Sequence, residues 1–252
     1  MNKKNLLLSC VSALLLISNI SYAKIKTIRF ALEATYAPFS ATHADKELDG
    51  FDVDIAKEIC KRLKAQCTFR DEPTGNMIPL LKAGKYDAWI GAITVTEERK
   101  KEIAFSDVYL SSTAKLMAAK NSTFNAAHIE IKGKTIGVEA GTSYIPYIEK
   151  MYGKTVKIQT FPTGHDSCQA LKDGKVDAVI DDELVLKHWR LDHGGKEQYR
   201  LIGLPAKHLS LIKQQYAIAV AKDNITLVKE IDRALSEMKA DGTYAKIIKK
   251  HF

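Results

Sequence analysis

The amino-acid sequence predicts an α/β protein with two similar lobes, each built on a parallel sheet. The first observation is a repeated phrase: LKAGKYDA at residues 81–88 returns as LKDGKVDA at residues 171–178, with six of eight positions identical. The second is that each copy ends an amphipathic helix at a glycine and then begins an apolar strand. The offset of 90 residues indicates two units of one kind. The alternative is a single continuous sheet that carries both copies.

Residues 1–23 have the pattern of a secretory signal peptide. Lys3 and Lys4 precede an apolar run at residues 6–17, and Ser21-Tyr22-Ala23 has the small residues of a cleavage site. An apolar run of about a dozen residues is too short to span a bilayer. We therefore expect export, with a mature chain that begins at Lys24.

The first series of elements alternates strands with helices. Phe51, Ile55, Ile59 and Leu63 recur at the spacing of one helix face. The predicted strands cover residues 27–32, 67–71 and 88–93, and the predicted helices cover 52–63 and 78–83. Such an alternation favours a parallel sheet with right-handed crossovers.

A second series of the same kind follows, after an extended segment that interrupts the alternation of strands and helices. Its predicted strands are 135–138, 156–160 and 178–181, and its predicted helices are 144–151, 167–173 and 184–191. Helices 227–239 and 244–250, separated by Gly242, end the chain. The extended segments 114–119 and 216–220 are predicted to form a two-stranded hinge. Lobe 1 then contains residues 24–111 and 216–252, and lobe 2 contains 112–215.

Charge and cysteine usage narrow the class of protein. The formal charge of +8 comes from scattered lysines, which argues against a nucleic-acid footprint. An exported chain meets an oxidising compartment, and Cys60 and Cys67 lie at the end of a predicted helix and the start of a predicted strand. We expect these two residues to form a disulfide, with Cys168 left as a buried free thiol. The seven histidines form no ligand cluster, so we expect no metal and no cofactor.

Polar residues follow several predicted strands, where ligands bind in open α/β sheets. Thr94 ends one strand, and Arg99 lies one turn into an acidic helix start, where its guanidinium can bind a carboxylate bidentately. The alternative is a surface arginine that pairs with Glu102. In the second series, the Gly141 turn and Ser143 offer free backbone N–H groups to an anion, or simply cap a helix.

The acidic candidates occupy the ends of two other strands. Asp181, Asp182 and Glu183 are adjacent carboxylates that repel one another unless a cation shares their site, or they form an acidic first helical turn. Glu33, with Tyr36 nearby, could hold a side-chain cation against a ring, or be solvated beside packed aromatics. Together with Arg99, these charges predict a ligand that is a zwitterion with a cationic tail.

Five motifs, taken in chain order, resemble the polar amino-acid-binding proteins of bacterial ABC importers, solute-binding protein family 3. They are TYAPF at 35–39, GFDVD at 50–54, GAITVTEER at 91–99, GTS at 141–143 and ADGTY at 240–244. The arginine-binding and lysine/arginine/ornithine-binding members are the most similar in pattern. The resemblance implies a type II periplasmic-binding-protein fold and a disulfide between Cys60 and Cys67.

The resemblance also implies a role for each candidate residue. Arg99 would bind the ligand α-carboxylate with Thr94 and Ser143, and Asp182 would bind the α-ammonium group. The residues facing the rest of the ligand would be Glu33 for its side-chain charge, Tyr36 for stacking, and Gly91 and Ala92 for backbone carbonyls. Thr74 and Tyr144 depart from the family, where an apolar or aromatic residue and a glutamine are common.

The predicted function is capture of a basic L-amino acid in the periplasm by hinge closure, and delivery to an ABC permease in the inner membrane. Arginine is the first candidate ligand, followed by lysine, ornithine and histidine. We expect a monomer without catalytic activity. Two alternatives stay open: a binder of glutamine or another polar amino acid, and a cyclohexadienyl-dehydratase-like enzyme on the same fold. The enzyme would use Glu33 or His165 as its general acid.

Overall fold

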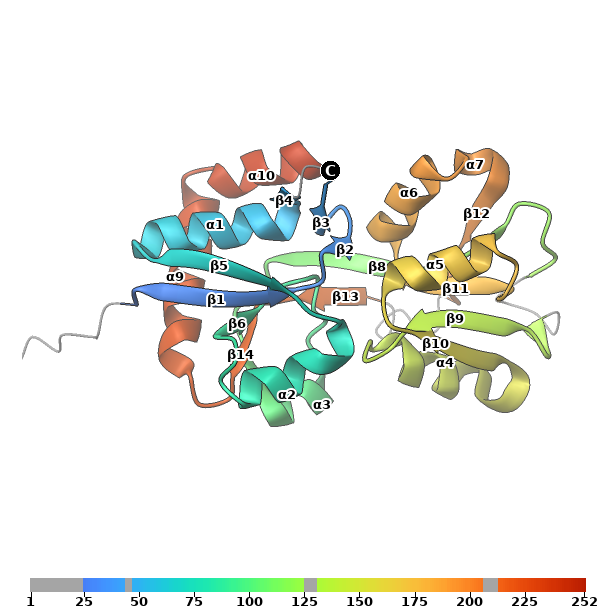
Figure 1. Ribbon diagram of the computed structural model, residues 1–252, viewed down its shortest axis with the longest axis horizontal. Helices are drawn as coiled ribbons and strands as arrows, with labels where there is room; N and C mark the ends of the chain where they lie inside the picture. The colour runs from blue at the N-terminus through green and yellow to red at the C-terminus, as the bar shows by residue number, and fades with distance from the viewer. Residues whose placement is uncertain (1–24, 44–46, 125–130, 206–212) are drawn as a thin grey trace, which may run out of the picture.

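Two lobes lie side by side, and each holds a sheet between layers of helices (Figure 1). The computed structural model describes residues 25–43, 47–124, 131–205 and 213–252. The predicted signal peptide and Lys24 lie outside the described residues. No helix in the described part of the chain has the length and apolar character needed to cross a membrane.

The sheet of lobe 1 has the strand order β5-β1-β6-β14-β7. The bounds are β1 Thr27–Leu32, β5 Gln66–Asp71, β6 Ala88–Trp89, β7 Ile103–Phe105 and β14 Ala219–Ala221. Strands β5, β1 and β6 are parallel, as predicted, whereas β14 is antiparallel to both of its neighbours. The expected strand at 88–93 ends early, because the chain turns at Gly91 and Ala92, where φ is +154° and +48°.

Helices cover both faces of this sheet. Phe51, Ile55 and Ile59 of α1 (Phe51–Leu63) pack with α9 (Ile225–Ala240) and α10 (Thr243–His251) over one face. Helix α2 (Met77–Lys82), which follows a 3-10 turn at Thr74–Asn76, covers the other face through Met77 and Leu81. A small antiparallel sheet of β2 (Thr35–Tyr36), β3 (Ser40–Thr42) and β4 (Leu48–Asp49) was not predicted.

Lobe 2 repeats the plan with the order β10-β9-β11-β8-β12. Its strands are β8 Leu110–Ala119, β9 Thr135–Glu139, β10 Lys157–Phe161, β11 Ala178–Asp182 and β12 Tyr199–Ile202. Helix α4 (Tyr144–Tyr152) with the turn Gly153–Thr155 lies on one face. Helices α5 (Gly164–Lys172), α6 (Glu183–Asp192) and α7 (Gly195–Gln198) complete the lobe. Strands β9, β10 and β11 are parallel, and β8 and β12 add antiparallel pairs.

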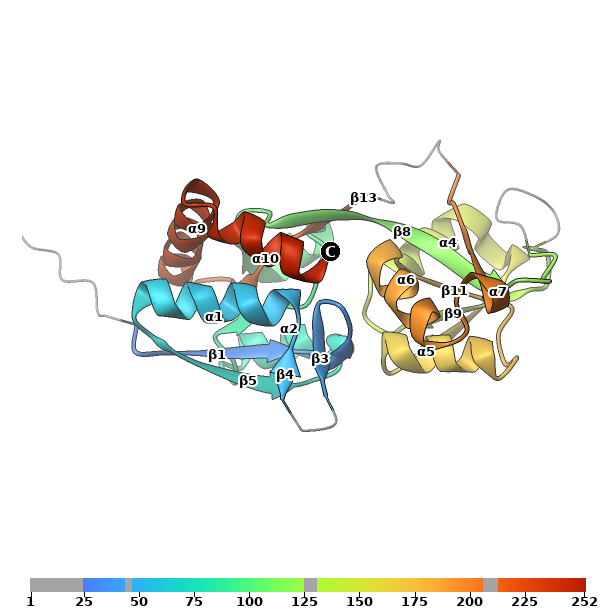
Figure 2. The same ribbon diagram turned by 90° about the horizontal axis from the view of Figure 1, so that it is seen from above.

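The chain crosses between the lobes along two antiparallel strands (Figure 2). The start of β8 pairs with β13 (Lys213–Tyr216), in the register from Leu110 opposite Tyr216 to Thr113 opposite Lys213. The predicted pairing of 114–119 with 216–220 is therefore wrong. Those apolar segments lie in the buried sheets of lobe 2 and lobe 1, and the mostly polar residues 110–113 and 213–216, which precede them in the chain, form the crossing.

The cysteines are arranged as the sequence predicts. Cys60 and Cys67 form a disulfide that joins the last turn of α1 to the start of β5. Cys168 is a free thiol, buried within α5.

We expect the Cys60→Ser/Cys67→Ser double variant to lose about 2.5 kcal/mol of unfolding free energy, because the bridge limits the freedom of the unfolded chain. Urea unfolding measures this loss. The wild-type protein in reducing agent should lose the same amount. Equal stability of the variant and the oxidised wild type would contradict the prediction.

Candidate functional site

The carboxyl ends of parallel strands from both lobes meet at the junction between them. Strands β1 and β6 of lobe 1 and β9 and β11 of lobe 2 all end there (Figure 1). The residues at or just beyond these ends are Glu33, Gly91, Ala92, Glu139, Asp181 and Asp182. This edge is where ligands bind in open α/β sheets.

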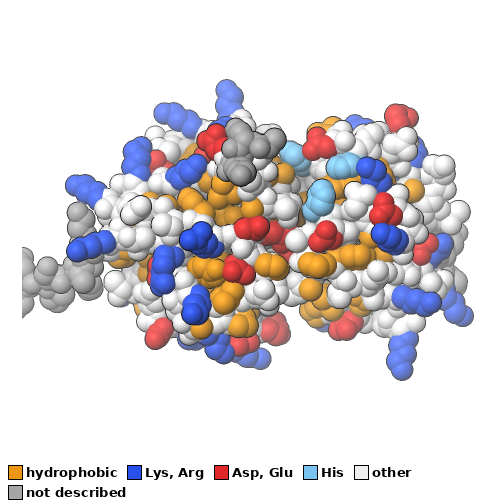
Figure 3. Space-filling view, in the orientation of Figure 1, with side chains coloured by type: hydrophobic (Ala, Val, Ile, Leu, Met, Phe, Trp, Pro, Cys, Tyr) orange, Lys and Arg blue, Asp and Glu red, His pale blue; other side chains and the backbone are white. Residues whose placement is uncertain are grey.

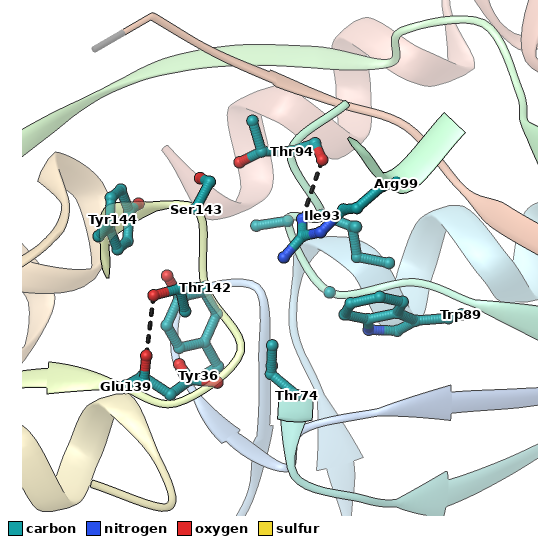
Figure 4. Close-up of a pocket in the computed structure, with 12 residues that line it drawn as sticks. Tyr36, Thr74, Trp89, Ile93, Thr94, Arg99, Glu139, Thr142, Ser143 and Tyr144 are labelled. Atoms are coloured by element: carbon teal, nitrogen blue, oxygen red, sulfur yellow. Dashed lines mark hydrogen bonds between the residues drawn. The ribbon is translucent and has the colours of Figure 1, made fainter. Parts of the chain in front are cut away.

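A cavity opens at this junction (Figure 4). Its lining combines residues of both lobes: Tyr36, Thr74, Trp89, Gly91, Ala92, Ile93, Thr94, Arg99, Glu139, Thr142, Ser143 and Tyr144. Six of the eight predicted site residues are among them. The other two, Glu33 and Asp182, are buried and do not line the cavity.

Arg99 is held between the lobes by backbone carbonyls. Helix α3 (Glu97–Glu102) begins at Thr96, whose hydroxyl accepts a hydrogen bond from the Arg99 amide at 3.1 Å. The guanidinium Nη1 donates to the Thr94 carbonyl at 2.9 Å, and Nη2 donates to the Gly141 carbonyl of lobe 2 at 2.8 Å. The group also lies 5.5 Å from the centre of the Trp89 ring.

The Arg99 guanidinium lacks a carboxylate partner within the described ranges. Glu102, the alternative partner suggested by the sequence, instead pairs with Lys82 at 3.0 Å. Burial lowers the pKa of Arg99, but an arginine keeps its charge at neutral pH. Two of its five N–H groups are used by the carbonyls. The remaining donors are therefore available to an anion in the cavity.

A buried aspartate fixes the loop that forms one wall of the cavity. Ala92 has a left-handed φ of +48°, which is costly for a residue with a Cβ. The Ala92 amide donates to Asp52 Oδ2 at 2.8 Å, and Asp52 lies fully buried in the first turn of α1. Burial raises the pKa of Asp52 to about 7. Sequence reasoning gave Asp52 no role, although it belongs to the GFDVD motif.

The two lobes touch at a pair of glycines. Gly141 has a φ of +79°, and a Cβ built on it would lie 2.7 Å from the Cα of Gly75. Only glycine permits this approach. The turn places Ser143 at the start of α4, where its hydroxyl faces the cavity and does not cap the helix (Figure 4).

Asp182 is fully buried and accepts hydrogen bonds from two elements. Its Oδ1 accepts a hydrogen bond from the Leu184 amide at 2.7 Å and so caps α6. This agrees with the alternative that the adjacent carboxylates form an acidic helix start. Its Oδ2 accepts from the Tyr216 hydroxyl at 2.5 Å. Tyr144 lines the cavity, and its pKa is raised by burial and by the nearby charges of Asp181 and Asp182. Asp182 thus lies behind Tyr144 and Tyr216, at the base of the hinge.

Three further carboxyls gather beside Tyr36. Glu33 accepts from the Thr35 hydroxyl at 3.1 Å, and Asp181 Oδ1 accepts from the Tyr36 hydroxyl at 2.5 Å. Glu139 ends β9 and lines the cavity. Burial raises the pKa of all three carboxyls, that of Asp181 to about 7. The sequence analysis gave Glu139 no role, although it stands at a strand end as Glu33 and Asp182 do.

His165 lies outside this cavity. It lines a separate groove between the β2–β3 turn of lobe 1 and helices α5 and α6, together with His43, His188 and His193. On the face shown in Figure 3, histidine and acidic side chains both gather where the lobes meet. The groove and the cavity share no lining residue.

Comparison with known proteins gives a family match over nearly the whole described chain. The sequence pattern of bacterial extracellular solute-binding proteins, family 3, matches residues 28–252. The histidine-binding periplasmic protein of Salmonella typhimurium is 35% identical over 226 residues, covering 89% of this chain and 87% of that protein. ABC transporter arginine-binding protein 1 of Escherichia coli is 34% identical over 247 residues, covering 96% of this chain and 97% of that protein.

Solved structures agree with the sequence matches. An ancestral arginine-binding protein bound to arginine superimposes with a TM-score of 0.84 at 34% identity, covering 91% of this chain and all of that one. The ancestral arginine-binding protein bound to glutamine gives a TM-score of 0.82 at 35% identity, covering 90% and 97%.

We expect the ligand-free protein to become less stable as the pH rises from about 5 to about 7. In this window unfolded Asp181 and Asp52, with ordinary pKa values of 3.8, have lost their protons, whereas the folded carboxyls keep theirs up to a pKa of about 7. Carboxyls with lowered pKa values, such as Asp177, titrate below this window. Melting temperatures measured across the range test the prediction.

Asp181→Asn should reduce this pH dependence, because the amide does not titrate. The matched control is Asp173→Asn on the exposed end of α5, which should keep the wild-type slope. A slope that is identical in Asp181→Asn and the wild type would contradict the assignment.

Proposed function

Because the chain belongs to the bacterial extracellular solute-binding proteins of family 3, we propose that it captures a basic L-amino acid, arginine first, for an ABC importer. Relatives in this family are named for histidine and arginine binding. The ligand would be held in the cavity between the lobes and released to a permease in the inner membrane. Lysine, ornithine and histidine are the next candidates.

One observation carries this proposal: the basic and acidic groups around the cavity form no ion pair with one another. Arg99 has no carboxylate partner on its side, and among the residues described Glu33, Glu139, Asp181 and Asp182 pair with no lysine or arginine. Buried charges are normally paired. An amino acid with a cationic side chain brings one carboxylate and two cations, which complements both groups.

The proposed contacts follow the position of each side chain. Arg99, with Thr94 and Ser143 beside it, would bind the α-carboxylate. Asp182 would bind the α-ammonium group once Tyr144 moves aside, since its carboxylate oxygens keep further lone pairs. Glu33 would face the side-chain cation, Tyr36 would stack on the side chain, and Gly91 and Ala92 would accept through their carbonyls.

The proposed mechanism is closure of lobe 1 (residues 24–111 and 216–252) on lobe 2 (residues 112–215) around the β8–β13 crossing. Ligand contacts reach both lobes, so the ligand stabilises the closed arrangement more than an open one. The Arg99–Gly141 hydrogen bond and the Gly75–Gly141 contact are the closed-state contacts that the ligand would reinforce.

The proposal includes the setting of the protein. We propose export to the periplasm by the signal peptide at residues 1–23, action as a monomer, and docking on the permease in the ligand-bound form. Amino-acid binding of this kind needs no cofactor.

A catalytic role is the weaker candidate. A dehydratase needs a general acid close to its substrate, and the raised pKa values of Glu33 and Glu139 fit that need, whereas His165 lies in the separate groove. We expect no turnover of prephenate or arogenate by the purified protein. Measurable release of product at a rate dependent on Glu33 would overturn the binding-only proposal.

The proposed ligand class is tested by a thermal-shift panel of the twenty amino acids and ornithine. A ligand that binds only the folded state raises the melting temperature, and at equal concentration a tighter ligand raises it more. We expect the largest rise with arginine. A panel in which no amino acid raises the melting temperature would contradict the proposed function.

Arg99→Ala should weaken arginine binding by about 2–5 kcal/mol, because the ligand carboxylate would then be buried without its partner. Arg99→Lys should recover only part of the loss, since an ammonium group cannot bind bidentately. Isothermal titration calorimetry measures both. Unchanged affinity in Arg99→Ala would remove this residue from the site.

A further inference from the structure

We propose that Glu139 and Asp181 of lobe 2 join Glu33 of lobe 1 to bind the distal cation of the ligand, and that the three carboxyls select a guanidinium. This inference rests on the proposed function and names the side-chain class that the same site accepts. It gives Glu139 a role that the sequence did not suggest, and it places Asp181, weighed earlier only as one of three adjacent carboxylates, at the ligand side chain. We call these three residues the acidic triad.

The acidic triad is deeply buried, and its carboxyls are only partly hydrogen-bonded. Glu33, Glu139 and Asp181 are 5%, 3% and 1% exposed. One oxygen of each finds no N–H or O–H donor among the described residues: Glu33 Oε2, Glu139 Oε1 and Asp181 Oδ2. Buried carboxylate oxygens without donors are costly. A cation with several N–H groups would satisfy all three.

The two lobe 2 carboxyls of the acidic triad lie close together beside Tyr36, and Glu33 interacts with one of them. The point where a Cβ on Gly164 would lie is 2.7 Å from Asp181 Oδ2, 3.4 Å from Glu139 Oε2 and 3.2 Å from Tyr36 Cε2. Burial, and after it the nearby charge of Glu33, raises the pKa of Glu139, which shows that these two carboxyls are close enough to interact. A Cβ at position 164 would clash with Asp181, so only glycine lets the start of α5 lie this close to the two lobe 2 carboxyls.

The acidic triad reaches the cavity that holds Arg99 through Glu139 and Tyr36. Glu139 and Tyr36 line the cavity together with Arg99, and Tyr36 bonds directly to Asp181. A ligand whose α-carboxylate meets Arg99 can extend its side chain past Tyr36 toward Glu139. Thr74, where relatives often have a bulkier residue, also lines this path and leaves room for it.

The geometry favours a guanidinium over an ammonium group. The acceptors come from the ends of three strands, β1, β9 and β11, on both lobes. A guanidinium spreads five N–H donors over a plane and can stack that plane on the Tyr36 ring. An ammonium group has three donors at one point and no face to stack. A neutral amide or urea group supplies no charge to offset the carboxyls.

The test compares L-arginine with L-citrulline, its uncharged isostere, and with L-lysine, by isothermal titration calorimetry. We expect the wild-type protein to bind arginine at least tenfold more tightly than either analogue. Glu139→Gln and Asp181→Asn should each reduce arginine affinity on the order of tenfold or more and change citrulline affinity much less. Glu149→Gln, on the exposed surface of α4, is the matched control and should bind as the wild type does.

The outcomes separate this inference from the proposed function. If the wild type binds none of the amino acids, the proposed function fails. If the wild type binds arginine but binds citrulline or lysine equally well, selection of a guanidinium is wrong. If Glu139→Gln and Asp181→Asn keep the wild-type ratio of arginine to citrulline affinity, the two residues do not bind the side-chain cation of the ligand. Because each substitution is nearly isosteric and removes a buried charge, both variants should fold, and their melting curves check this.

Discussion

The structure depends on an arrangement of charge: a guanidinium and several buried carboxyls line or flank one cavity, and no ion pair joins them among the described residues. Burial of a charge is unfavourable unless a partner is present. Arg99 is held by two carbonyls, not by an acid, and the nearby acids are held by hydroxyls and amides, not by bases. The protein supplies a guanidinium and several carboxyls, and a small zwitterionic ligand would supply the carboxylate and the cations that bind them.

The fold produces this separation from a simple repeated plan. In both lobes, strands run toward the junction and end there, so the polar residues after β1, β6, β9 and β11 face one another. Two glycine turns let the lobes approach, and the polar β8–β13 strands cross between them. Asp52 then fixes the Ala92 turn from beneath. These features belong to the backbone, and the side chains at the strand ends decide what the cavity accepts.

The sequence predicted much of this arrangement because its signals were local and periodic. The helix at Phe51–Leu63, the two α/β lobes, the disulfide and the family membership are confirmed. The position of the hinge strands was wrong. The apolar segments predicted to form the hinge lie in the buried sheets of the two lobes, and the crossing is made by mostly polar residues. The short strands β2, β3 and β4 depend on tertiary pairing rather than on a pattern of their own. Glu139 and Asp181 were missed as a pair because contact between residues 42 positions apart requires the folded lobe.

Complementary charge is tested most directly by deleting one ligand charge at a time. Agmatine is arginine without its carboxylate, and 5-guanidinovaleric acid is arginine without its α-ammonium group. Calorimetric titration of both compounds into the wild-type protein should show affinities lower than that for arginine by roughly a hundredfold or more, because each leaves one buried pole unpaired. Binding of either compound as tightly as arginine would contradict the account.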